Sequence, residues 1–170
     1  MGPEAGREAE VLEAHDLHGE TGSRLAVTLV TPAASVVSGD ADEIIAPGVE
    51  GEFGVLRGHV PVVSALKPGV LTVRDGAQRK VFAVGPGFLQ VSAGGRTRVL
   101  VQRAVAAADV DVDDARAQKA AAEDVLRRAA TGTGQPGTPS APGAVAQAQA
   151  SLAWAQAQLD ASAAMAHPTR

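Results

Sequence analysis

Glycines and prolines punctuate residues 42–71 at short, regular intervals, and this spacing limits what the chain can fold into. The segment reads DEIIAPGVEGEFGVLRGHVPVVSALKPGVL, in which short apolar runs alternate with Pro-Gly, Gly-His-Val-Pro and Lys-Pro-Gly sequences. Glycine allows positive φ and proline fixes φ, so both residues favour tight turns and interrupt helices. The segment therefore predicts short strands joined by tight turns.

The strand pattern continues on both sides of this segment. Leu25, Val27 and Leu29 alternate with Ala26, Thr28 and Val30, as expected of a strand with one well-buried face. The other predicted strands span residues 33–38, 42–46, 53–56, 61–66, 70–74, 80–84, 88–91 and 98–101. The first of these is expected to stop at Gly39-Asp40, because both residues favour turns.

Two dipeptides in the second half of this region are typical of tight hairpin turns. Asp75-Gly76 and Gly94-Gly95 each separate two apolar runs, and these residue types tolerate the positive φ of a two-residue turn. Repeated strands and turns without helices between them indicate two packed sheets or a closed sheet. The sequence predicts an antiparallel β-sandwich or flattened barrel over residues 25–106.

Beyond Ala108 the apolar period changes from two residues to about 3.6, which predicts a helix. Asp109 or Asp111 can cap its start, and the helix should end near Ala130. On its surface the sequence predicts i,i+4 ion pairs, Glu123 with Arg127 and Asp124 with Arg128.

A second helix is predicted after a breaker-rich loop. Residues 131–143 contain repeated Gly, Pro, Ser and Thr, which predicts a flexible loop, and residues 144–164 again consist of helix formers. The expected apolar seam of this helix is Val145, Ala148, Leu152, Ala155 and Leu159. Because alanine buries little apolar area, residues 107–170 should form a helical arm that is held weakly.

Charge and composition exclude several classes of protein. A net charge of −4 with only 2% aromatic residues argues against nucleic acid as a partner. No apolar run reaches the roughly 18 to 20 residues that span a bilayer. Residues 1–24 carry many acidic side chains without a continuous apolar core, which predicts a solvated, disordered extension rather than a signal or transit peptide.

The turns of residues 42–71, together with the helical tail, resemble the epsilon subunit of bacterial rotary ATP synthases. The quoted turns are EGEFG at 50–54, GHVP at 58–61 and KPG at 67–69. The resemblance implies a non-catalytic rotor subunit of a proton-translocating ATP synthase, peripheral at the cytoplasmic face of the bacterial cell membrane. Its implied partners are the gamma subunit, the membrane c-ring and the beta and alpha subunits, and its arm is implied to restrain ATP hydrolysis.

The resemblance also implies two contact sites in the sandwich. Glu50, Gly51, Glu52 and Phe53 match the turn through which the family touches the membrane ring, and His59 matches a turn histidine that lies toward the gamma subunit. From the residues alone, the alternatives are a solvated hairpin tip and an ordinary turn histidine.

Two further sites are implied on the first tail helix. Asp113 and Arg116 match a motif associated with ATP binding in some members, but Ala107 stands where nucleotide-binding members carry glutamate, so only weak ATP binding is expected. The alternative, favoured by the residues alone, is a helix cap with an intrahelical ion pair. Arg127 and Arg128 are implied to approach an acidic segment of the beta subunits when the arm is extended.

No catalytic motif is present in the sequence. Serines occur without a partnered histidine and acid, and no phosphate-binding glycine loop precedes a helix. His15 and His18 have helical spacing, but two histidines in a disordered segment make a poor metal site, so neither a metal nor a resident cofactor is expected. The alternative function is a free-standing β-sandwich that binds a small ligand and carries a helical oligomerisation tail.

Overall fold

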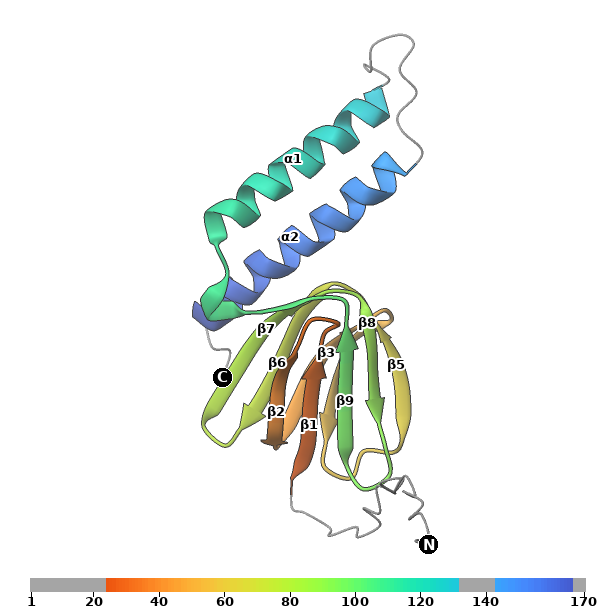
Figure 1. Cartoon of the computed structure of the whole chain (residues 1–170), viewed down its shortest axis with the longest axis vertical. Helices are drawn as coiled ribbons and strands as arrows, with labels where there is room; N and C mark the ends of the chain where they lie inside the picture. Colours follow the sequence, from red (N-terminus) through yellow and green to blue (C-terminus); the bar gives the residue numbers. More distant parts are fainter. Residues whose placement is uncertain (1–23, 132–142, 167–170) are drawn as a thin grey trace, which may run out of the picture.

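Ten strands are followed by two long helices in the computed structural model, which describes residues 24–131 and 143–166 (Figure 1). The strands are β1 (Leu25–Val30), β2 (Ser35–Ala41), β3 (Glu43–Gly48), β4 (Gly51–Leu56), β5 (Val62–Leu66), β6 (Gly69–Asp75), β7 (Gln78–Val84), β8 (Gly87–Val91), β9 (Arg96–Val101) and β10 (Ala104–Ala106). A 3-10 turn, η1 (Ala107–Asp109), leads to α1 (Val112–Thr131) and α2 (Ala144–Ala166). Apart from Arg24, Thr131 and Gly143, the predicted acidic extension and inter-helix loop lie outside the described residues.

The strands form one sheet that folds over on itself into a nearly closed sandwich. Their order is β10-β7-β6-β3-β5-β8-β9-β1-β2, and β4 pairs with β3 outside this path. At the fold, β3 and β5 share a single residue pair, Gly48 with Leu66, so the two halves of the sheet can face each other. The predicted fold class, β-sandwich followed by helices, is confirmed.

Alternating side chains explain how the two layers enclose one core. In β9 the inward residues Thr97, Val99 and Val101 are buried, whereas Arg96, Arg98 and Leu100, which alternate with them, are exposed. The largest fully buried side chains all belong to the strands: Leu25, Leu29, Ile44, Leu71, Leu89, Val27, Val55, Val84, Val99 and Thr97. The core cluster of the sandwich contains no residue of either helix.

One strand pair departs from the antiparallel pattern that the sequence predicts. β1 pairs with β9 in parallel, with Val27 opposite Thr97 and Val30 opposite Leu100. Parallel neighbours need a long connection, and here most of the sheet lies between the two strands in sequence. No local turn signal could have indicated this pair.

The predicted end of the second strand at Ser38 is wrong, because β2 continues to Ala41. Gly39, Asp40 and Ala41 pair with Val27, Ala26 and Leu25, so the beginning of β1 supplies partners for two residue types that usually break strands. The hairpin at Asp75-Gly76 is confirmed with a shift of one residue. Asp75 closes β6 opposite Gln78, and the loop is Gly76-Ala77, with positive φ at Gly76 alone.

The start of α1 is fixed by the second of the two candidate caps. The backbone N–H groups of Asp113 and Asp114 donate to Asp111 Oδ1 over 3.1 and 3.0 Å, so Asp111 satisfies two donors that the first helical turn leaves free. The predicted pair of Glu123 with Arg127 is wrong. Asp124 instead accepts from Arg127 and also pairs with Arg128.

The single apolar seam predicted for α2 is incomplete. Ala148 and Ala155 are buried, whereas Val145 is 38% exposed and Leu152 and Leu159 are half-buried. α2 also buries Trp154, Ala157, Gln158 and Ala161, because it lies between α1 and the outer face of β6 and β7 (Figure 1). A helix held from two sides needs two buried faces, and alanines at most positions hide the second one from a periodicity count.

Candidate functional site

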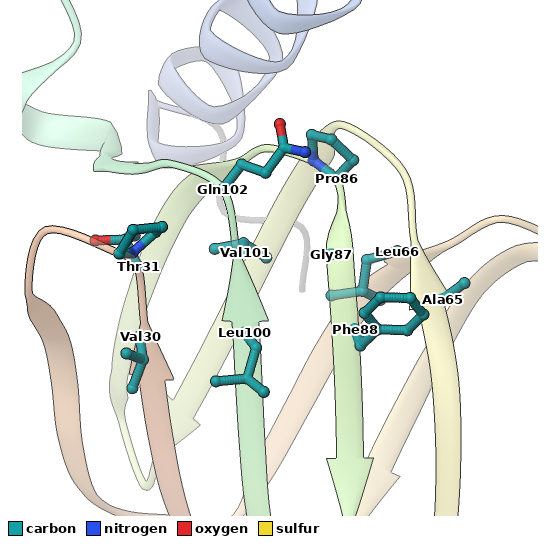
Figure 2. Close-up of a pocket in the computed structure, with 11 residues that line it drawn as sticks. Val30, Thr31, Ala65, Leu66, Pro86, Gly87, Phe88, Leu100, Val101 and Gln102 are labelled. Atoms are coloured by element: carbon teal, nitrogen blue, oxygen red, sulfur yellow. The ribbon is translucent and has the colours of Figure 1, made fainter.

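An apolar row crosses four strands on the outer face of the sandwich. This apolar row consists of Ala65 of β5, Phe88 of β8, Leu100 of β9 and Val30 of β1 (Figure 2). The strand register builds it, because each member lies directly opposite the next across neighbouring strands. Residues 70 positions apart, Val30 and Leu100, thus meet on one surface.

The centre of the apolar row is open to solvent. Phe88 is 57% exposed and Leu100 is 47% exposed, and Val63, two residues before Ala65 on the same face of β5, is 65% exposed. The row borders a shallow hollow of about 620 Å³, whose lining includes the buried Leu66 and Val101. Contiguous apolar groups that remain uncovered on a folded chain mark a surface for another macromolecule or ligand.

Gly87 allows β8 and β9 to approach closely beside the hollow. A Cβ atom at Gly87 would lie 2.0 Å from the carbonyl oxygen of Leu100, so no other residue fits there without moving one of the strands. The absent side chain therefore helps to hold Phe88 next to Leu100 in the row (Figure 2).

Sequence reasoning missed the apolar row, although a signal for it exists. Phe88-Leu89 and Val99-Leu100-Val101 are continuous apolar runs, whereas a strand with one solvated face should alternate. Such runs indicate strands that are covered on both faces. The sandwich covers one face of these two strands, and the other remains uncovered in the described chain.

The predicted ring contact forms the tip of the β3–β4 hairpin. Gly48 pairs with Gly51, so the tip is Val49-Glu50, and both of these side chains are exposed. The Phe53 ring lies over Gly48, nearer the tip than its own partner Ala46, because a Cβ atom at Gly48 would lie 2.9 Å from the ring. Glu50 and Glu52 thus present the acidic surface of this turn, and a ring contact through residues 50–53 stays a prediction.

His59 lies in the turn at the opposite end of the β3–β4 ribbon. Its backbone N–H donates to Leu56 O over 3.1 Å, and its ring Nδ1 lies 2.8 Å from Val60 O. Leu56 and Val60 beside it are 56% and 69% exposed. The turn therefore offers apolar surface next to a histidine, and a gamma-subunit contact at His59 stays a prediction.

The predicted sites on α1 are solvent-facing. Arg116 Nη1 lies 3.3 Å from Asp113 Oδ1, and both side chains are mostly exposed, so this pair matches the favoured reading of an intrahelical ion pair. Ala107, at the position of the family's glutamate, is buried against α2. Arg127 and Arg128 extend from the same helix and share Asp124. ATP binding and a beta-subunit contact stay predictions.

The described residues hold neither a cluster of metal ligands nor a membrane-spanning helix. Across residues 24–131 and 143–166, His, Asp and Glu side chains nowhere gather in a group of three that could hold a metal ion. Neither α1 nor α2 is long and apolar enough to cross a bilayer.

A family model and curated proteins match this chain. Residues 24–107 match the model described as ATP synthase, Delta/Epsilon chain, beta-sandwich domain. An ATP synthase epsilon chain from Anaeromyxobacter sp. (strain K) is 49% identical over 92 residues, which cover 54% of this chain and 69% of the relative. The epsilon chain from Maricaulis maris (strain MCS10) is 39% identical over 113 residues, which cover 62% of this chain and 84% of the relative.

Solved structures share the fold over a longer span. A chain in the Euglena gracilis mitochondrial ATP synthase, OSCP/F1/c-ring in rotational state 1, aligns with 97% of this chain and 90% of its own length, with a TM-score of 0.68 and 21% identity. A chain in the Tetrahymena thermophila mitochondrial ATP synthase, central stalk/c-ring, aligns with 81% of this chain and 96% of its own, with a TM-score of 0.54 and 18% identity. At these identities the likeness concerns the fold, and it includes helices as well as sandwich.

Proposed function

Because the chain belongs to the family of ATP synthase epsilon chains, we propose that it couples the central stalk of a proton-translocating ATP synthase to its membrane ring and restrains ATP hydrolysis through its helical arm. The epsilon chain is a non-catalytic subunit of that complex. The free-standing ligand-binding module is set aside, since the relatives are subunits of an assembly. The chain acts at the cytoplasmic face of the membrane and is attached there through its partners.

The apolar row is the observation that carries this proposal, because a central-stalk subunit must be held firmly by the shaft that it turns with. Phe88 and Leu100 are large apolar side chains at the centre of an open surface, and aromatic residues such as phenylalanine are enriched at protein interfaces. The gamma subunit is the proposed occupant, with His59 at the border of its contact. The acidic tip at Glu50 and Glu52 faces the c-ring.

The arm supplies the regulatory part of the proposal. The side chains of Arg127 and Arg128 are each 70% exposed, and both pair with Asp124 on the same helix. Exposed pairs of this kind contribute about 0.3 to 0.5 kcal/mol each. Such pairs exchange readily for an acidic partner. In the extended position the two arginines approach an acidic segment of the beta subunits and hold back hydrolysis.

Nucleotide enters the proposal only as a weak ligand of the arm. Asp113 and Arg116 supply a carboxylate and a guanidinium on one exposed face of α1, and a guanidinium is suited to phosphate. Their pairing with each other and the alanine at position 107 both limit the affinity for ATP.

Affinity purification from membranes tests the proposed assembly. A tagged full-length chain should recover the alpha, beta and gamma subunits of ATP synthase. A matched chain with Phe88→Asp and Leu100→Asp should fold, because both side chains point to solvent, and should recover much less of the three subunits. A full-length chain that stays monomeric and never associates with these subunits would contradict the proposal.

A further inference from the structure

The arm is attached to the sandwich through one half of one helix. α2 packs on β6, β7 and η1, whereas α1 packs mainly on α2 (Figure 1). The buried contact consists of Val81 and Ala83 from β7, Ala107 from η1, and Trp154, Ala157 and Ala161 from α2. Apart from Trp154 these side chains are small, so the burial of apolar area stabilises this contact only modestly.

Arg103 covers the one large side chain of this contact. It lies in the turn between β9 and β10, and its guanidinium carbon is 4.3 Å from the centroid of the Trp154 ring, which is the geometry of a cation–π interaction. Trp154 is only 7% exposed. Desolvation by burial lowers the pKa of the Arg103 guanidinium from its ordinary value, which agrees with a charge that is partly shielded from water.

Gly85 gives Arg103 its position. The backbone N–H of Gly85 donates to Arg103 O over 2.8 Å, and a Cβ atom at Gly85 would lie 2.9 Å from Arg103 Cγ. The aliphatic stem of the arginine thus lies against a glycine. A side chain at position 85 would push this stem away from Trp154.

A second arginine holds the far end of α2. Arg79 of β7 donates from Nη1 to the carbonyl oxygen of Ala164 over 2.8 Å. Ala164 lies in the last turn of α2, where carbonyl groups lack helical partners and the helix end is negative, so a guanidinium is favourable there. Trp154 and Ala164 are ten positions apart, or roughly 15 Å along the helix axis.

We propose that Arg103 and Arg79 form a two-point clasp that keeps the arm on the sandwich and sets how often it is released. The inference rests on the proposed function, in which the released arm is the one that restrains hydrolysis. Both arginines belong to the sandwich and both targets belong to α2, so the two contacts must break together when the arm leaves. Loss of either arginine should shift the population toward the released arm.

Trp154 reports directly on the clasp in the isolated full-length chain. It is the only tryptophan, and the chain has no tyrosine, so the intrinsic fluorescence comes from this ring. Arg79→Gln is the decisive variant, because it removes the contact at Ala164 without touching Trp154. We expect red-shifted emission and an about fivefold larger fraction of acrylamide-accessible tryptophan, with unchanged helicity by circular dichroism.

Three matched variants complete the test. Arg79→Lys keeps a charged donor and should restore most of the protection, and Arg96→Gln removes an exposed arginine far from the arm and should change nothing. Gly85→Ala should expose Trp154 by displacing Arg103 while every charge is retained. Emission and quenching that are identical in Arg79→Gln, Gly85→Ala and the unmodified chain would overturn the clasp.

ATP hydrolysis by the assembled complex shows whether the clasp is absent or whether the released arm does not restrain hydrolysis. If both hold, Arg79→Gln should lower hydrolysis, because more arms are released to restrain it. Exposed Trp154 in the isolated variant with unchanged hydrolysis in the complex would support the clasp and contradict the braking role.

Discussion

Phe88 differs from the other aromatic residues in where its ring lies. Phe82 is in the sandwich core, Phe53 packs against that core, and Trp154 of the arm is enclosed against the sandwich, whereas Phe88 is open to solvent. Its strand neighbour Leu100 is also exposed, so the two side chains share one uncovered surface. An exposed aromatic beside an exposed leucine gains little from burial within the described chain, which supports the proposed role of the two residues in binding.

We expect Phe88→Asp to weaken binding to F1 particles depleted of epsilon by roughly 30-fold or more, since loss of a hot-spot residue at the centre of an interface costs about 2 kcal/mol or more. The fold should be unaffected, because the side chain already faces water. Titration calorimetry measures the affinity. Val125→Ser on α1 removes an exposed apolar side chain elsewhere and serves as the control. Equal affinities of Phe88→Asp and the unmodified chain would exclude the apolar row as the docking surface.

At Asp113 and Arg116 we expect weak ATP binding that each alanine substitution lowers about tenfold, which corresponds to about 1.4 kcal/mol for one charge-assisted contact. Calorimetry with the full-length chain measures this, and Gln118→Ala on the same helix is the control. If the unmodified chain releases no heat with ATP, the two residues serve only as an exposed intrahelical ion pair.

Among the elements, strands were easier to predict than their partners. Alternation in Leu25–Val30 and the Gly/Pro turns gave most strands to within one or two residues, because these signals are local. The parallel β1–β9 pair and the apolar row that it helps to build depend on residues far apart in sequence. In α2 the alanine-rich pattern hid the second buried face. Trp154 holds α2 on the sandwich through contacts with β7 and Arg103, and no local pattern indicates these contacts.

The β-sandwich should fold without the arm. Its core cluster contains no helical residue, and removal of the arm uncovers mainly Val81 and Ala83 on the outer face. A chain that ends at Ala108 should therefore give a β-type circular dichroism spectrum and a cooperative unfolding transition, with a free energy of unfolding modestly below that of the full chain. A non-cooperative transition or a disordered spectrum would mean that the arm is part of the folding unit.

On the scale of the whole molecule, the two proposed tasks fall on two separate surfaces. The apolar row lies on the β5-β8-β9-β1 part of the sheet, and the arm covers β6 and β7, so docking and arm release do not compete for the same strands. The arm is joined to the sandwich through η1 and held by small side chains and two arginines. A stalk subunit built in this way can stay bound to its partners while the arm changes position.

ATP hydrolysis by assembled complexes tests the central claim most directly. Complexes with the full-length chain and with a chain that ends at Ala108 are compared in matched membranes at several ATP concentrations, after equal amounts of the alpha, beta and gamma subunits have been verified. The account predicts normal assembly with the shortened chain, because the sandwich retains the apolar row. It also predicts faster hydrolysis, because the arm that restrains hydrolysis is missing. Unchanged hydrolysis at every ATP concentration would contradict it, since the arm would then restrain nothing.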